Sequence, residues 1–114
     1  MVCKEITEKS ELEKVLAESG QGKVLIFKHS TACPISARAW REVQKFAAET
    51  KAELQGVMIK VIESRPLSNF VAENFLVTHQ SPQVLLLSKG LVVWHTSHQE
   101  VTQENIEQAI AALG

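Results

Sequence analysis

The sequence predicts an α/β fold in which a central mixed β-sheet is flanked by helices on both faces. Apolar runs of strand length alternate with amphipathic helical patterns through the first two thirds of the chain. The last two strand patterns are separated by only three residues, Ser88-Lys89-Gly90, so they form a hairpin and are antiparallel. A β–α–β crossover followed by a hairpin gives a sheet with both parallel and antiparallel pairs.

The strand patterns include one continuous apolar run, Val24–Phe27, of the kind found in a central strand that is covered on both faces. A short first strand over Val2–Ile6 is the least apolar of the set, and this segment fits either a sheet edge or a disordered tail. The predicted strands are residues 2–6, 23–28, 56–62, 83–87 and 91–96.

The helices are predicted from apolar stripes at helical spacing and from residues that favour helix starts. Thr7 and Thr102 are cap candidates, while Pro34 and Pro66 suit the first helical turn. The predicted helices cover residues 7–18, 34 to about 51, 66–75 and 102–113. This order of elements is that of a thioredoxin-like fold.

Length and composition limit the class of protein. The 114 residues, 45% of them hydrophobic, fit a single domain over residues 1–114. Twelve basic and thirteen acidic residues form no charged block, which disfavours nucleic acid and acidic membranes as partners. No apolar run approaches the roughly 20 residues of a membrane span, and the N-terminus lacks a signal-peptide core. We therefore expect a cytoplasmic protein without a structural disulfide.

Cys33 stands at the junction between a buried strand and a proline-initiated helix. The unpaired N–H groups and the positive end of the helix dipole at such a junction favour the thiolate, which is the reactive form of cysteine. A lone cysteine is, in general, more often a small buried hydrophobe. The position after a buried strand, where ligands gather in α/β folds, favours a redox nucleophile instead.

The motif around this cysteine is C-x-x-S, with Ser36 at the position where a dithiol redox protein carries its second cysteine. The Ser36 hydroxyl has two possible roles of similar weight: a hydrogen bond to the sulfur, or a cap of the helix through one of its backbone N–H groups. Without a second thiol, a mixed disulfide on Cys33 waits for an external thiol.

The sequence resembles the bacillithiol-system redox proteins known as monothiol bacilliredoxins, which are thioredoxin-like. The likeness covers nearly the whole chain and rests on two motifs, C-P-I-S at residues 33–36 and S-P-Q at residues 81–83, with a later W-H-T-S-H at residues 94–98. It implies that Cys33 is the catalytic nucleophile and that bacillithiol is its co-substrate thiol. The supporting residues are then Thr31, Ala32, Pro34, Ile35 and Ser36.

Similarity to thioredoxin-like proteins also implies a cis peptide bond between Ser81 and Pro82, beside the active cysteine. A cis geometry there would free the Ser81 backbone N–H and C=O to pair with a bound thiol or peptide, as an added strand does. Ser81 and Pro82 are therefore expected to form the substrate groove.

The remaining cysteine and the histidines are expected to be outside the chemistry. In a parallel sheet, Cys3 lies a strand length of roughly 17–20 Å from Cys33, far beyond the ~7 Å Cα separation of a disulfide. Metal binding is disfavoured because three or four converging ligands are required. His29 and His79 flank the two loops of the site and could contact Cys33 or a ligand carboxylate, although an ordinary hydrogen-bonded role is favoured. Trp40 is expected to pack, and Arg38 to be solvated.

The leading interpretation is a monothiol thiol–disulfide oxidoreductase that removes bacillithiol from protein mixed disulfides. Its expected partners are bacillithiolated proteins and a low-molecular-weight thiol, and it is expected to act as a monomer. Two alternatives remain open. One is a glutaredoxin-like iron–sulfur carrier, weakened because Pro34-Ile35 replaces the usual glycine-phenylalanine pair. The other is a non-catalytic binding module that keeps only the groove.

Overall fold

The computed structural model is built on strand β2 (Lys23–His29), which occupies the middle of a five-stranded sheet of order β1-β3-β2-β4-β5. It describes residues 1–113; Gly114, the last residue of the predicted domain, lies outside the described residues. The other elements are β1 (Cys3–Glu5), α1 (Lys9–Ser19), α2 (Pro34–Glu49), β3 (Leu54–Lys60), α3 (Arg65–Phe75), β4 (Gln83–Ser88), β5 (Leu91–Ser97), the 3₁₀ turn η1 (His98–Glu100) and α4 (Gln103–Ala111).

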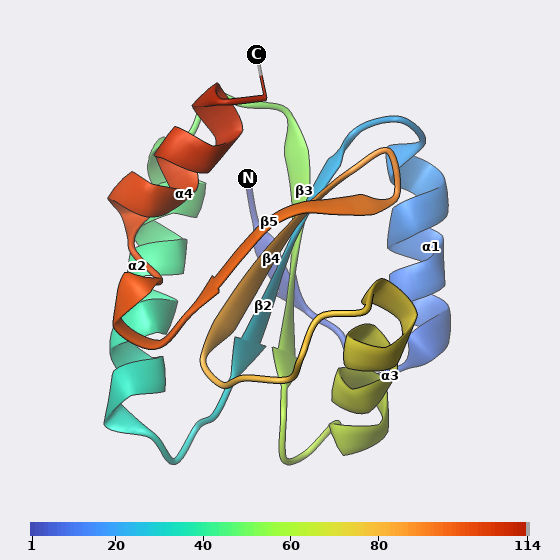
Figure 1. Cartoon of the computed structure of the whole chain (residues 1–114), viewed down its shortest axis with the longest axis vertical. Helices are drawn as coiled ribbons and strands as arrows, with labels where there is room; N and C mark the ends of the chain where they lie inside the picture. Colours follow the sequence, from blue (N-terminus) through green and yellow to red (C-terminus); the bar gives the residue numbers. More distant parts are fainter. Residues whose placement is uncertain (114) are drawn as a thin grey trace.

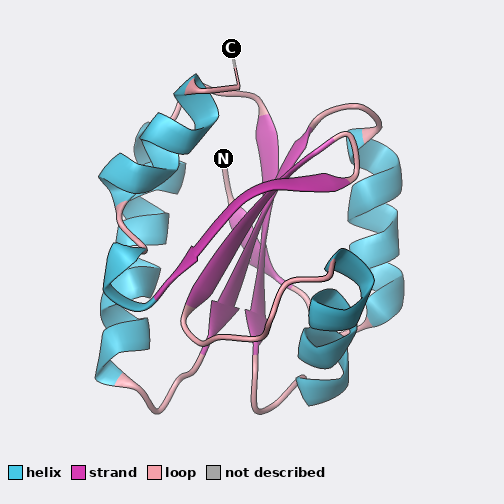
Figure 2. Cartoon of the chain, in the orientation of Figure 1, coloured by secondary structure: helices cyan, strands magenta, loops and turns pink. Residues whose placement is uncertain are grey.

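The sheet is mixed, as the sequence predicts. Strand β2 pairs parallel with β3 and antiparallel with β4, while β1 and β5 occupy the edges. Helices α1 and α3 cover one face and helices α2 and α4 cover the other (Figures 1 and 2). Because β2 is central and covered on both faces, six of its seven residues are buried.

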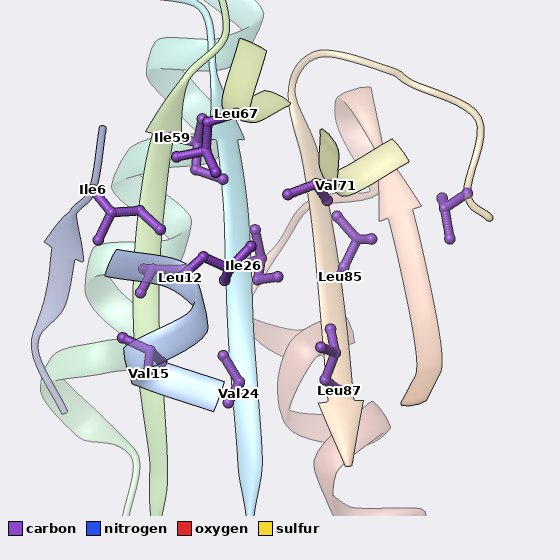
Figure 3. Close-up of a cluster of buried hydrophobic side chains, with 12 residues drawn as sticks. Ile6, Leu12, Val15, Val24, Ile26, Ile59, Leu67, Val71, Leu85 and Leu87 are labelled. Atoms are coloured by element: carbon purple, nitrogen blue, oxygen red, sulfur yellow. The ribbon is translucent and has the colours of Figure 1, made fainter. Parts of the chain in front are cut away.

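Each face of the sheet packs its own hydrophobic core. The core under α1 and α3 includes Ile6, Leu12, Ile26, Ile59 and Leu85, whose side chains converge in Figure 3. The core under α2 and α4 is formed by the alternate residues of the strands and by the inner faces of these helices, among them Leu25, Phe27, Val43, Phe46, Leu86 and Ile106. The period of two along β2 thus sends successive side chains to different cores.

Some predicted boundaries were wrong, for local reasons. The strand predicted at 56–62 lies at 54–60, because the Val61 N–H donates to the His29 carbonyl at 2.9 Å and the chain then turns. Thr7 does not cap α1, because the N-cap is Glu8. The backbone N–H groups of Thr7 and Glu8 both donate to the Glu11 carboxylate. Helices α2 and α4 end two residues earlier than predicted. The edge strand β1 and the Thr102 cap are confirmed.

None of the helices within residues 1–113 has both the length and the apolar character that crossing a bilayer requires.

Replacing Ile26 by alanine tests the dependence of the fold on β2. Ile26 is fully buried in the α1/α3 core, so Ile26→Ala is expected to lower the free energy of unfolding by about 2–5 kcal/mol. The control Ile62→Ala removes the same atoms from a side chain that is 53% exposed and should change stability by only about 0.5 kcal/mol. Urea denaturation of both variants checks this, and similar losses for the two would contradict the central placement of β2.

Candidate active site

The Cys33 turn connects the end of β2 to the start of α2. The Cys33 N–H donates to the Ser30 carbonyl at 3.2 Å, which closes a tight turn over residues 30–33. Cys33 has an extended backbone and is the N-cap of α2, Pro34 is the first helical residue, and the Cys33 carbonyl accepts the Ala37 N–H at 3.0 Å. No acidic residue lies in the first turn of α2. The helix dipole therefore acts on Cys33 without an opposing carboxylate from that turn.

The surface around Cys33 is open. Cys33 is half-buried and unpaired, whereas its neighbours Thr31, Ala32, Pro34 and Ile35 are exposed. The Thr31 hydroxyl donates to the Glu63 carboxylate at 3.3 Å, which links the turn to the loop after β3. The sulfur thus lies in a fixed turn at the protein surface, where a disulfide of another molecule has access.

Ser36 adopts neither of its two expected roles. Its side chain is completely buried, and its hydroxyl accepts the Ser30 N–H at 2.8 Å and lies 2.7 Å from His29 Nδ1. The capped N–H therefore belongs to the loop before Cys33 and not to the helix. Ser36 holds the turn from inside, and this explains why a polar side chain is buried one helical turn after the cysteine.

His29 is enclosed by aromatic rings beneath the turn. Its ring stacks on Trp40 and Phe27, with centroids 6.0 and 5.6 Å away, so the predicted packing role of Trp40 is confirmed. Burial, followed by the Lys60 charge, lowers the pKa of His29, while the Glu63 charge acts in the opposite direction. His29 is therefore a neutral hydrogen-bonding partner of Ser36 near pH 7.

The second loop of the site precedes β4. The peptide bond between Ser81 and Pro82 is cis, as predicted. Lys28 of β2 pairs with Gln83 of β4 in an antiparallel register. The residue before Gln83, Pro82, therefore lies opposite the residue after Lys28, His29, at the start of the Cys33 turn. Both loops lie at the same end of the sheet (Figure 1). Within residues 1–113 no backbone hydrogen bond engages Ser81, and the Pro82 carbonyl accepts the His98 N–H at 3.0 Å.

A buried polar cluster behind this loop was not predicted. Lys28 is fully buried on the α1/α3 side, with its Nζ 3.1 Å from His79 Nδ1, and the Ser68 hydroxyl lies 3.5 Å from the same nitrogen. Burial lowers the pKa of Lys28 to about 8. The sequence holds a partial signal, since Lys28 directly follows the apolar run Val24–Phe27 of a strand that is covered on both faces.

Cys3 lies away from the two loops. In the strand register, Cys3 lies opposite Gly56 of β3, which lies opposite Leu25 near the amino end of β2. The Cys3 thiol forms no disulfide, as predicted. Burial raises the pKa of its thiol to about 12, so it stays protonated. Among the described residues, no group of three histidine, cysteine or acidic side chains converges to hold a metal ion.

Comparison with solved structures assigns the class of protein. A protein assigned as an oxidoreductase with a thioredoxin fold matches with a TM-score of 0.87 and 31% identity, over 96% of this chain and 94% of that one. A redox protein from Chlamydomonas reinhardtii matches at a TM-score of 0.82 and 22% identity, over 97% of this chain and 35% of that one. Oxidised thioredoxin from Plasmodium falciparum matches at 0.75 and 15%, over 98% of both chains. The chain has the fold of a thioredoxin-fold oxidoreductase.

The family follows from the sequence. The model of the family Monothiol bacilliredoxin BrxC matches residues 4–106, nearly the whole chain. The chain belongs to the monothiol bacilliredoxins, which confirms the resemblance.

Removal of the Ser36 hydroxyl tests its role in the turn. Ser36→Ala leaves the Ser30 N–H and the His29 ring nitrogen without their buried partner, so the free energy of unfolding should fall by about 1–3 kcal/mol. Urea denaturation measures the loss. Ser10→Ala, an exposed serine of α1, is the control and should be nearly neutral. Equal stability of Ser36→Ala and the wild type would contradict the structural role of Ser36.

The buried Lys28 predicts a pH-dependent stability. Its pKa is about 8 in the folded protein and 10.5 as the ordinary value, so between these values the unfolded chain holds a proton that the folded protein has released. The contribution of Lys28 to the free energy of unfolding therefore rises with pH over this interval, by roughly 2–3 kcal/mol. The Cys3 thiol, whose pKa is raised from 9.0 to about 12, acts in the opposite direction above pH 9 and is the same in all three proteins compared below.

Lys28→Met should lose this contribution, so that its free energy of unfolding falls progressively behind that of the wild type as the pH rises, whereas the Lys45→Met curve, from an exposed lysine, should run parallel to the wild type. Urea denaturation from pH 7 to 10.5 gives the three curves. Parallel curves for the wild type and Lys28→Met would show that Lys28 is solvated.

Proposed function

We propose that this protein removes bacillithiol from protein mixed disulfides, with Cys33 as its nucleophile. The observation that carries the proposal is the placement of a half-buried, unpaired cysteine, flanked by exposed residues, at the N-terminus of α2, with a buried serine one turn later. Membership of the monothiol bacilliredoxin family supports bacillithiol as the co-substrate. We further propose that the chain acts as a monomer in the cytoplasm.

The first step transfers bacillithiol to the protein. The Cys33 thiolate attacks the bacillithiol sulfur of the mixed disulfide, a new sulfur–sulfur bond forms to Cys33, and the bond to the substrate protein breaks. The substrate leaves as a thiolate and takes a proton from water. Attack at this sulfur is favoured when the ligand lies along the backbone of Ser81. Within residues 1–113 the Ser81 N–H and C=O make no backbone hydrogen bond, so they are free to pair with the bound thiol as an added strand does.

The second step restores Cys33. A second bacillithiol thiolate attacks the bacillithiol sulfur bound to Cys33, which releases bacillithiol disulfide and the Cys33 thiolate. The net reaction converts one mixed disulfide and one thiol into a protein thiol and a small disulfide. Ser36 has no thiol and its hydroxyl is bonded inward, so the mixed disulfide on Cys33 persists until the external thiol arrives.

Intact-protein mass spectrometry tests the proposal. Wild type and Cys3→Ser, treated with bacillithiol disulfide near pH 7, should each gain one bacillithiol, and an added bacillithiol excess should remove it. Cys33→Ser should gain none, because the buried Cys3 thiol remains protonated. No adduct on the wild type, or an adduct on Cys33→Ser, would refute Cys33 as the nucleophile.

Release of the substrate protein is measured in the same way. A bacillithiolated model protein mixed with Cys33-containing enzyme should lose one bacillithiol as the enzyme gains one. If the enzyme reacts with bacillithiol disulfide but leaves the protein adduct intact, the chain binds the thiol and is not a de-bacillithiolating enzyme.

A further inference from the structure

The two ring nitrogens of His79 have different surroundings. Nδ1 lies 3.1 Å from Lys28 Nζ and 3.5 Å from the Ser68 hydroxyl, two side chains that are at most 1% exposed. The histidine itself is exposed, and within residues 1–113 its ring hydrogen bonds are made through Nδ1, which leaves Nε2 to the solvent. One nitrogen therefore faces the protein interior and the other faces outward.

The lysine determines which nitrogen carries the proton. An ammonium group has three donors and no acceptor, so Lys28 donates and His79 Nδ1 must accept. A neutral imidazole that accepts at Nδ1 carries its proton at Nε2. Burial and the charges of Lys28 on β2 and Arg65 on α3 lower the pKa of His79, which keeps the ring neutral at pH 7.

The local charge favours an anionic ligand. Within residues 1–113 no carboxylate lies within ion-pair distance of Lys28, and the salt bridges formed there join Lys45 to Glu42 and Lys60 to Glu5. The buried positive charge is therefore not neutralised by a neighbour. Arg65 adds a second positive charge close enough to lower the pKa of His79. An exposed N–H donor in a positive potential binds a carboxylate better than a neutral group.

The position of His79 is fixed on both sides. The Gln83 side chain donates to the Thr78 carbonyl at 3.0 Å and accepts the Gln80 N–H at 3.4 Å, so one glutamine holds the residues before and after His79. Ser81 and Pro82, the proposed groove, follow directly. The donor is thus held in place before a ligand arrives, and this reduces the cost of ordering it.

We infer that His79, held in its Nε2–H tautomer by Lys28, is a specificity residue that donates a hydrogen bond to a carboxylate of the small thiol on the mixed disulfide. The inference rests on the proposed function for the place of that thiol along Ser81. His79 takes no part in the sulfur chemistry. It selects thiols that carry a carboxylate over neutral thiols of similar size.

Nitrogen-15 NMR of the full chain tests the tautomer. At pH 7, the wild-type His79 ring should show a protonated Nε2 and an unprotonated Nδ1, and Lys28→Met should populate both tautomers. A wild-type ring protonated at Nδ1, or a ring unchanged in Lys28→Met, would overturn the inference. The wild-type measurement needs no variant, so it decides the tautomer even where Lys28→Met fails to fold.

Kinetics with three disulfides test the specificity. The rate of adduct formation on Cys33 is measured with bacillithiol disulfide and glutathione disulfide, which carry carboxylates, and with hydroxyethyl disulfide, which is neutral. His79→Ala should slow the first two by about three- to tenfold and leave the third unchanged. His79→Gln, whose amide can donate from the position of Nε2, should recover most of the loss.

The outcomes separate this inference from the proposed function. A wild type that reacts with glutathione disulfide but not with bacillithiol disulfide would refute bacillithiol as co-substrate, while the His79 dependence of the glutathione reaction would still support the carboxylate contact. Equal slowing of all three disulfides in His79→Ala, or no slowing of the two charged ones, would refute the role of His79.

Discussion

The antiparallel register between β2 and β4 is the constraint on which the site depends. It pairs Lys28 with Gln83, so the chain leaving β2 toward Cys33 and the chain entering β4 from Pro82 meet at one end of the sheet. A slip of one residue would exchange the two faces of β2 and place Phe27 on the side of Lys28. Because both faces of β2 are packed against separate cores, such a slip is strongly opposed, and the two loops stay in register.

The same alternation divides the polar groups at the end of β2. His29 faces the α2 layer and is satisfied by Ser36 of that helix, whereas Lys28 faces the α1/α3 layer and is satisfied by His79 of the loop before β4. Each pair ties one loop of the site to one face of the sheet. The apolar run of β2, residues 24–27, is thus followed by two polar residues, and each of them fixes the loop on its own side.

The sequence was sufficient for the features that depend on local pattern. The helix start at Pro34, the hairpin at Ser88–Gly90 and the mixed sheet follow from residue periodicity and turn chemistry, and the cis bond before Pro82 followed from family resemblance. The hydrogen-bond partners of the Ser36 and Lys28 side chains could not be predicted from the sequence. Their hydrogen bonds join residues 7 and 51 positions apart, and only the three-dimensional packing brings those atoms together. Periodicity tells which residues are buried, but not which polar groups meet inside.

The hydrogen bonds of Ser36 bear on why the site contains a single thiol. A side chain at this position could face Cys33, yet the Ser36 hydroxyl is engaged by Ser30 and His29 on the inner side of the turn. A cysteine there would offer a larger atom and a much weaker acceptor to the Ser30 N–H, and would leave the His29 nitrogen poorly satisfied. The serine is therefore part of the structure that positions Cys33, and a second thiol at residue 36 would disturb that structure. One hydroxyl group thus holds the turn and takes the place that a second thiol would need.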